Sequence, residues 1–239
     1  MVDAGVGALR QLRKVGVSAD ALDAVLMTHW HLDHFAGLRG LIDSRTCHSS
    51  LPVLGPEPSG AARLLLRTIC PAALRSFHPV RGGRPIRISD IETEPIDTIH
   101  RTASVGWKLT EASLMNRRMV ISGDTRPTEA IIEAAMKADL LVHEATYLQL
   151  HSDRAVRRWH STATEAARLA LESEVGGLAL THTSSRYTME MIGAEAEAIF
   201  SGAFVVTPLT TMSIERLPDE SARTGCGWGQ LSVQAGIAG

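Results

Sequence analysis

The chain has few cysteines and no long apolar run, and both absences narrow its class. Its 239 residues include only three cysteines, Cys47, Cys70 and Cys226, at unrelated spacings, so a disulfide framework is not expected. No apolar run approaches the ~20 residues that a membrane-spanning helix needs, and the first residues lack the basic and apolar regions of a secretory signal. We therefore expect a protein of a reducing compartment, by default the cytoplasm, with no membrane partner.

Lysine is scarce as well. Only Lys14, Lys108 and Lys137 are lysines among 24 basic residues, and 26 acidic residues bring the formal net charge to −2. No global positive field therefore draws the protein to nucleic acid. Two arginine-bearing stretches, 81–87 and 154–158, could still contact phosphates, although a solvated face is the commoner explanation of such stretches.

Hydrophobic residues make up 44% and charged residues 21%, which suits one globular domain with a single core. Strand-like and helix-like segments alternate along the chain, a pattern typical of α/β layers. The expected strands are 24–28, 52–55, 106–109, 119–122, 140–143, 178–181 and 204–206, with β-like alternation over 86–99. The expected helices are 61–70, 128–138, 162–173 and 189–200, after a helical segment ending near Gly16. We expect a domain over residues 1–216 and a loose tail over 217–239.

Four of these strand-like runs lead into a metal-capable side chain, namely His29, Asp124, His143 and His182. Open α/β sheets bind ligands at the rim formed by the carboxyl ends of their strands. The sequence therefore predicts a functional site at one rim of a sheet.

The densest group of such side chains follows the first expected strand, in the segment 28–34 (THWHLDH). Imidazole and carboxylate groups suit Zn²⁺ and similar divalent ions. His29 and His31 project the same way from an extended segment, whereas Asp33 and His34 in a turn can point to a second metal. A histidine-rich surface loop is the alternative, but such a surplus of ligands directly after a buried strand favours two metals.

The segment 29–34 resembles the H-x-H-x-D-H signature of the metallo-β-lactamase superfamily. Five further segments resemble its ribonuclease Z branch, in family order: 2–5 (VDAG), 122–125 (SGDT), 143–146 (HEAT), 160–162 (HST) and 180–187 (LTHTSSRY). The resemblance implies an α/β fold, the four-layer αβ/βα sandwich, with a dinuclear metal site. The commonest β-lactamases differ, since they use a cysteine ligand and lack a histidine after the aspartate.

The resemblance also assigns the ligands. His29, His31 and His100 would hold the first metal, and Asp33, His34 and His182 the second, with Asp124 bridging the two. His100 is matched through Ile99-His100 followed by Gly106-Trp107, which resembles the family's third motif. Zinc fits this set, and manganese or iron(II) accepts the same ligands.

The implied reaction is the hydrolysis of a phosphodiester by a water that two metals activate. Asp33 would hold and deprotonate that water, and His160 would protonate the leaving oxygen. His143 and Glu144 would shape the site by hydrogen bonds. Three further residues could contact an anion or cap the local structure: Ser184, Ser185 and Arg186.

Two departures from the family pattern bear on the substrate. Only 23 residues separate His100 from Asp124, too few for the arm with which tRNA-processing members clamp the tRNA elbow, so smaller phosphodiesters or unstructured RNA become more plausible substrates. Family members also have two or three strands ahead of the VDAG segment. We therefore expect an N-terminally truncated first sheet, whose exposed edge a homodimer partner could cover.

The sequence thus predicts a metallo-hydrolase, most simply a ribonuclease Z-like endoribonuclease acting on RNA or another phosphodiester. A hydrolase of the same scaffold acting on a small ester, thioester, lactone or sulfate ester remains open. So does a non-catalytic remnant that keeps the motifs. A metal-regulated RNA-binding module is disfavoured by the overall charge.

Overall fold

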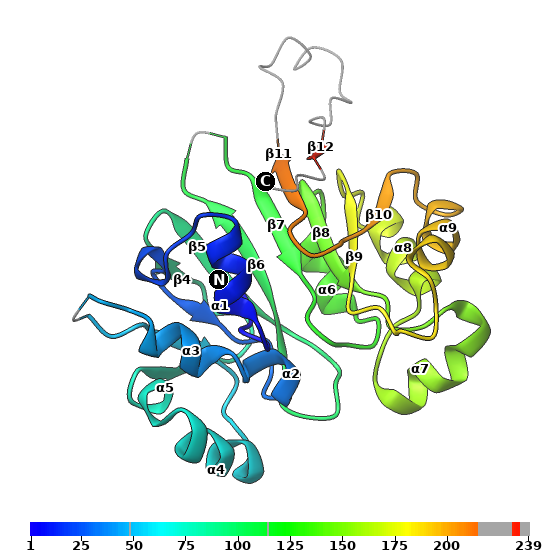
Figure 1. Cartoon of the computed structure of the whole chain (residues 1–239). Helices are drawn as coiled ribbons and strands as arrows, with labels where there is room; N and C mark the ends of the chain where they lie inside the picture. The colour runs from blue at the N-terminus through cyan, green and yellow to red at the C-terminus, as the bar shows by residue number, and fades with distance from the viewer. Residues whose placement is uncertain (48, 114, 215–230, 235–239) are drawn as a thin grey trace.

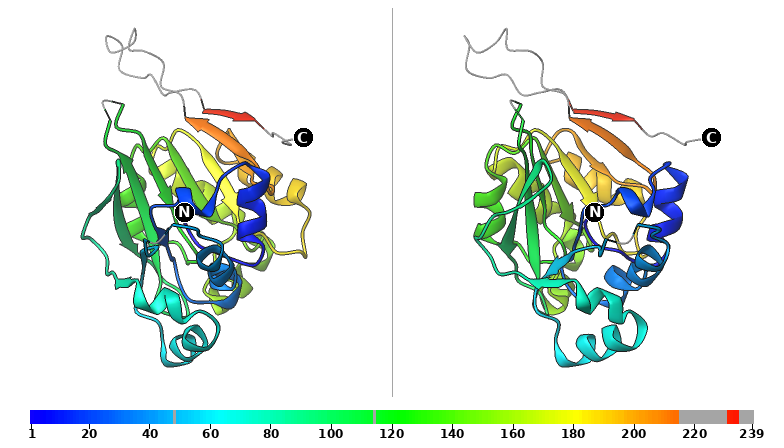
Figure 2. Two further views of the ribbon diagram at one scale, coloured as in Figure 1. Left: turned by 60° about the vertical axis from the view of Figure 1, so that its left-hand side comes forward. Right: turned by 90° about the vertical axis from the view of Figure 1, so that its left-hand side faces the viewer.

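Two β-sheets pack face to face, and helices cover the outer face of each, which gives four layers (Figures 1 and 2). The computed structural model describes residues 1–47, 49–113, 115–214 and 231–234. The expected α/β sandwich is confirmed, because three separate cores fill the three spaces between the layers.

The first sheet is small and parallel, in the order β1 (Val25–Leu26), β2 (Val53–Gly55), β3 (Phe77–Pro79). Alternate residues of a strand point to opposite faces. Val25 and Val53 accordingly pack in the core beneath the outer helices, whereas Leu26 and Leu54 pack in the core between the two sheets. The helices of this half are α1 (Ala8–Lys14), α2 (Leu32–Phe35), α3 (Leu38–Asp43), α4 (Gly60–Ile69) and α5 (Pro71–Arg75). The chain crosses to the second sheet after β3.

The second sheet has seven strands in the order β10-β9-β8-β7-β6-β5-β4. Their bounds are β4 (Ile86–Ile88), β5 (Ile91–Asp97), β6 (Val105–Glu111), β7 (Arg118–Ile121), β8 (Leu140–Glu144), β9 (Leu178–Thr181) and β10 (Ala203–Val205). The strands β4 to β7 are antiparallel, and β7 to β10 are parallel. Parallel neighbours need crossover connections, which contain α6 (Glu129–Ala135), α8 (Ala163–Glu172) and α9 (Met189–Glu197).

Helix α8 shows why these crossovers form where the sequence predicts them. The Thr162 side chain accepts a hydrogen bond from the Glu165 backbone, and the Glu165 carboxylate accepts one from the Thr162 backbone. This capping box satisfies amide groups that the first helical turn leaves unpaired. Its small apolar residues then bury against the sheet, so that the predicted helix over 162–173 is confirmed.

Trp107 lies in the core between the sheets and is fully buried. Its indole nitrogen donates a hydrogen bond to the Met27 carbonyl over 3.2 Å. The Val105 amide likewise donates to the Thr28 carbonyl over 2.8 Å. These contacts fix the chain after β1 against β6, immediately before the histidine-rich segment.

Several short elements have no counterpart among the sequence predictions, because they span too few residues for a periodic pattern. They are α2, α3, α5, β3, η1 (Ala19–Ala21), η2 (Gln149–His151), α7 (Ser152–Arg158) and β11 (Thr211–Ile214). Within the expected tail, β12 (Leu231–Gln234) pairs antiparallel with β11, and the remainder of 217–239 lies outside the described residues. No helix among the described residues is long and apolar enough to cross a membrane.

Replacing Trp107 by alanine should destabilise the fold by about 3–5 kcal/mol, because it leaves a cavity between the sheets. The free energy of unfolding from urea titration measures the loss. Leu150→Ala is the control, since Leu150 is 85% exposed and its truncation should cost less than about 0.5 kcal/mol. Similar losses in both variants would contradict this description of the core.

Candidate metal centre

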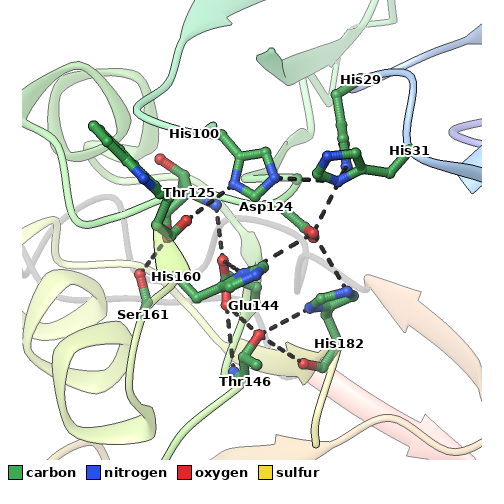
Figure 3. Close-up of polar contacts among 12 residues, drawn as sticks. His29, His31, His100, Asp124, Thr125, Glu144, Thr146, His160, Ser161 and His182 are labelled. Atoms are coloured by element: carbon green, nitrogen blue, oxygen red, sulfur yellow. Dashed lines mark hydrogen bonds and ion pairs between the residues drawn. The ribbon is translucent and has the colours of Figure 1, made fainter. Parts of the chain in front are cut away.

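The carboxyl ends of β1, β7, β8 and β9 meet at one rim of the sandwich, as the sequence predicts. The loops at this rim gather side chains from positions far apart in the sequence (Figure 3). The residues that meet there are His29, His31, Asp33, His34, His100, Asp124, Glu144, His160 and His182. Every residue that the sequence analysis assigned as a metal ligand is therefore in one place.

One group consists of His29, His31, His100 and Asp124, whose ligand atoms all lie within 4.8 Å of one another. His29 Nε2 lies 2.8 Å from His31 Nδ1, and His100 Nε2 lies 3.3 Å from the same atom. This is the set that the resemblance assigns to the first metal, together with its bridging carboxylate.

A second group consists of Asp33, His34 and His182. Helix α2 begins at Leu32, so Asp33 and His34 lie in its single turn. Asp124 Oδ2 lies 3.3 Å from His182 Nε2, 3.6 Å from His34 Nε2 and 3.7 Å from His29 Nε2. Asp124 therefore stands between the two groups, in the position of a bridging ligand.

Asp3 orients one histidine of each group, a role that the sequence analysis did not find. Its Oδ2 accepts hydrogen bonds from His34 Nδ1 and from Thr28 Oγ1, each over 2.7 Å. Because Thr28 Oγ1 gives its proton to Asp3, it can only accept from His29 Nδ1, 3.0 Å away. Each imidazole thereby has its Nδ1 bound on the outer side and its Nε2 turned toward Asp124.

Two glycines allow the backbone segments around these residues to approach closely. A Cβ at Gly5 would lie 2.2 Å from the Asp33 carbonyl oxygen, and one at Gly123 would lie 2.8 Å from Thr28 Cβ. Gly123 also has a φ of 61°, in the left-handed region that glycine adopts without steric cost. Glycine is therefore required beside both Asp3 and Asp124.

Glu144, at the end of β8, is a buried carboxylate with a full set of hydrogen-bond donors. Its Oε1 accepts from His160 Nδ1 and from the Thr125 amide, each over 2.8 Å. Its Oε2 accepts from Thr146 Oγ1 over 2.6 Å, and that hydroxyl in turn accepts from His182 Nδ1 over 2.8 Å. One carboxylate therefore orients both His160 and His182.

His100 comes from the loop between β5 and β6 and is held by the main chain. Its Nδ1 donates to the Trp159 carbonyl over 3.0 Å, which leaves Nε2 facing His31. His160 follows Trp159 directly, and the two imidazole rings lie 5.1 Å apart between centroids.

The protonation of these groups suits a cation. Burial is the main cause that lowers the pKa of His29, to about 2, and it also lowers those of His31 and His100, so that these imidazoles are neutral at pH 7. Burial alone would raise the pKa of Asp124, but His34 and His182 outweigh it and hold that carboxyl below its usual range. Burial likewise lowers the pKa of His34, but the Asp124 and Asp3 carboxylates raise it to about 10. A metal must displace that proton, so metal binding releases protons here.

The donor set itself tests whether a metal fits. The Nδ1 atoms of His29 and His100 each donate a hydrogen bond away from the site. In these neutral rings each Nε2 therefore carries a lone pair, and both Nε2 atoms face His31 Nδ1. At most one proton can lie among these three nitrogen atoms. Acceptor atoms that converge without donors are satisfied by a cation. This first group therefore fits a divalent ion, and Asp33, His34 and His182 offer ligands of the right types for a second.

Other candidates from the sequence lie differently. His143 is fully buried, and its Nδ1 donates to the Glu144 carbonyl. Burial lowers its pKa, so it is a neutral residue beneath the site. The Ser184 hydroxyl accepts hydrogen bonds from the amide and the guanidinium group of Arg186. Both hydrogen bonds are local and lie within a single turn of the chain.

Comparisons with known proteins agree with this geometry. Residues 1–183 match the model of the beta-lactamase superfamily domain. A ribonuclease Z of Haloferax volcanii is 32% identical, with the match covering 86% of this chain and 82% of the relative. The chain belongs to the metallo-β-lactamase superfamily, in its ribonuclease Z-like branch.

Solved structures support the same fold. The metallo-beta-lactamase fold protein YhfI from Bacillus subtilis superposes with a TM-score of 0.74 at 25% identity, covering 87% of this chain and 83% of that one. The short form of human tRNase Z gives 0.67 at 24% identity, covering 86% and 84%.

The purified chain should hold about two equivalents of divalent metal, and Asp124→Ala should lose most of it, because that carboxylate belongs to the first group and approaches His34 and His182 of the second. Elemental analysis of folded protein measures the content. Asp3→Asn should keep the ligands but weaken zinc affinity by about 10–100-fold, since it disturbs the orientation of His29 and His34.

Asp20→Asn is the matched control for Asp3→Asn. Asp20 also accepts several hydrogen bonds, from Thr46 and Cys47, but it touches no ligand. Well-folded wild-type protein that binds no metal would contradict the metal centre, and equal zinc affinities in all three proteins would contradict the role of Asp3.

Proposed function

We propose that the chain is a metal-dependent phosphodiesterase, a ribonuclease Z-like endoribonuclease that uses two divalent ions, with zinc the best fit to its ligands. The observation that carries the proposal is His160, held by the buried Glu144 carboxylate beside two ligand groups with Asp124 between them. Hydrolysis of a phosphodiester needs a nucleophile on one side of the phosphorus and a proton donor on the other, and this arrangement offers both. The relative named ribonuclease Z supports the same substrate class.

His29, His31 and His100 would hold one ion, and Asp33, His34 and His182 the other, with Asp124 between them. When bound, two such ions make water nucleophilic at neutral pH and polarise a phosphoryl oxygen. The neutral imidazoles and the ionised Asp124 are in the protonation states that cation binding needs.

Asp33 is the group we assign to the attacking water. Its side chain is 69% exposed at the mouth of the site. The imidazole of His182, whose Nε2 lies 3.9 Å from Asp33 Oδ2, holds the pKa of this carboxyl below its usual range, so that it is ionised at neutral pH. It can accept a hydrogen bond from the water, orient it and take its proton.

His160 is the group we assign to the leaving oxygen. Its Nδ1 is committed to Glu144, which leaves Nε2 free to carry a proton toward the substrate. A histidine oriented by a carboxylate is a recurring form of the general acid. The alkoxide that leaves a ribose is strongly basic, so protonating it is a large part of the barrier.

The substrate that we propose is RNA that is bound close to the metal centre and needs no contact with a distant part of the RNA. The strands β6 and β7 and the turn between them take up most of the 23 residues between His100 and Asp124. The human tRNase Z short form shares the fold, but recognition of a tRNA elbow would need an extension at this point. Unpaired RNA or a small phosphodiester is therefore the better fit.

The zinc-loaded protein should accelerate hydrolysis of bis(p-nitrophenyl) phosphate over background far more than hydrolysis of p-nitrophenyl acetate. Phosphoryl transfer needs the paired cations, whereas an activated carboxylic ester does not. Spectrophotometric rates with wild type and Asp124→Ala measure the difference. A larger acceleration on the acetate would favour the small-ester hydrolase, and none on either substrate in metal-loaded protein would favour the non-catalytic alternative.

His160→Ala should lower kcat on a ribonucleotide phosphodiester by about 10²–10⁴-fold, because the leaving alkoxide must be protonated. On bis(p-nitrophenyl) phosphate the loss should be much smaller, since nitrophenolate leaves unprotonated. His151→Ala is the matched control, because His151 contacts the Tyr187 hydroxyl and lies in none of the ligand groups. Equal losses on both substrates would show that His160 is not the proton donor.

A further inference from the structure

Helix α7 and the residue after it, Trp159, flank the candidate metal centre on one side. The Trp159 carbonyl accepts the hydrogen bond that orients His100, and His160 is the next residue. In Figure 1, α7 lies at the same end of the molecule as α2, which carries Asp33 and His34. Trp159 therefore contacts the candidate metal centre through its main chain, and Arg157 and Arg158 directly precede it in the sequence.

Trp159 is in a backbone conformation that its side chain disfavours. Its φ is 64° and its ψ is 40°, at the left-handed position that ends the helix. Glycine is the usual residue there because a Cβ is strained in this region, and a bulky aromatic residue is a true outlier. Burial does not compensate, since Trp159 is 40% exposed. Residues held in strained backbone conformations cluster at active sites and at ligand-binding positions.

The adjoining charge is positive. Helix α7 contains three arginines, Arg154, Arg157 and Arg158, and a single acid, Asp153. All three arginines are exposed, and none of them takes part in the ion pairs found among the described residues. The helix dipole favours cations in its last turn, but it does not account for an exposed indole beside them. An indole next to unpaired guanidinium groups matches the base and phosphate of a nucleotide.

We propose that Trp159, Arg157 and Arg158 form a docking surface for an unpaired stretch of polynucleotide, which enters the metal centre past α7. The indole stacks on a base next to the scissile phosphodiester, and the guanidinium groups contact the neighbouring phosphates. A base must be free of its own helical stack to lie on an indole, so this surface selects single-stranded over duplex substrates. The proposal rests on the phosphodiesterase function proposed above.

Trp159→Gly is the informative variant, because glycine keeps the left-handed turn and hence the carbonyl that orients His100. The measured quantity is kcat/KM of the zinc-loaded chain on an unpaired oligouridylate, divided by kcat/KM on bis(p-nitrophenyl) phosphate. Loss of one base stack should lower this ratio about tenfold, mainly through KM. Trp159→Phe keeps an aromatic face and should recover most of the ratio.

The arginines are tested by the salt dependence of binding. Fluorescence anisotropy of a labelled oligouridylate gives Kd over a series of salt concentrations. Arg157→Ala/Arg158→Ala should reduce the slope of log Kd against log salt by about one. Arg84→Ala/Arg87→Ala is the matched control, with the same change of charge around strand β4, at the opposite edge of the large sheet.

The outcomes separate this surface from the proposed function. An unchanged substrate ratio in Trp159→Gly, or equal changes of slope in both arginine pairs, would overturn the docking surface while hydrolysis of the small diester stands. If wild type hydrolyses neither substrate, but Trp159→Gly and the α7 arginine variant weaken oligouridylate binding selectively, the surface stands and the hydrolase proposal fails. A duplex RNA that binds as tightly as the oligouridylate would overturn the selection of single strands.

Discussion

Asp124 carries a negative charge into a region where most of its neighbours are imidazoles, and the rest of the site depends on that charge. Burial on its own would favour the neutral carboxylic acid. His34, His182 and His29 lie within 3.7 Å of its Oδ2 and reverse the balance. An ionised carboxylate at this point can be shared by two cations whose mutual repulsion would otherwise keep them apart.

Two further carboxylates act on the site from outside. Asp3 holds His29, through Thr28, and His34 directly. Glu144 holds His160 directly and His182 through Thr146. In His29, His34 and His182 the nitrogen that is taken is Nδ1, which leaves Nε2 turned toward Asp124. The same device thus orients metal ligands and a candidate proton donor.

The sequence predicts this site well where the signal is local. The histidine-rich segment, the strand that ends before Asp124 and the capped helix after His160 are each visible within about ten residues. Asp3 and Thr146 lie in segments that resemble the family, 2–5 and 143–146, but neither was given a role, because the histidines that they contact lie 31 and 36 residues away. The short helices α2 and α7 were missed for a related reason, since one or two turns are set by tertiary contacts rather than by periodicity. The left-handed backbone conformation of Trp159 could not be predicted, because it is visible only in the three-dimensional structure.

The ligands come from both halves of the sandwich. His29, His31, Asp33 and His34 follow the first sheet, whereas Asp124 and His182 follow strands of the second. Ions bound among them would cross-link two layers that also meet through an apolar core and a few hydrogen bonds, such as that from Trp107 to the Met27 carbonyl. The free energy of unfolding should then include a contribution that grows with the logarithm of the free metal concentration. In a cell that lacks zinc, the loss of bound ions would then lower the stability of the fold as well as the activity. The less stable protein would be exposed to proteolysis before zinc could be bound again.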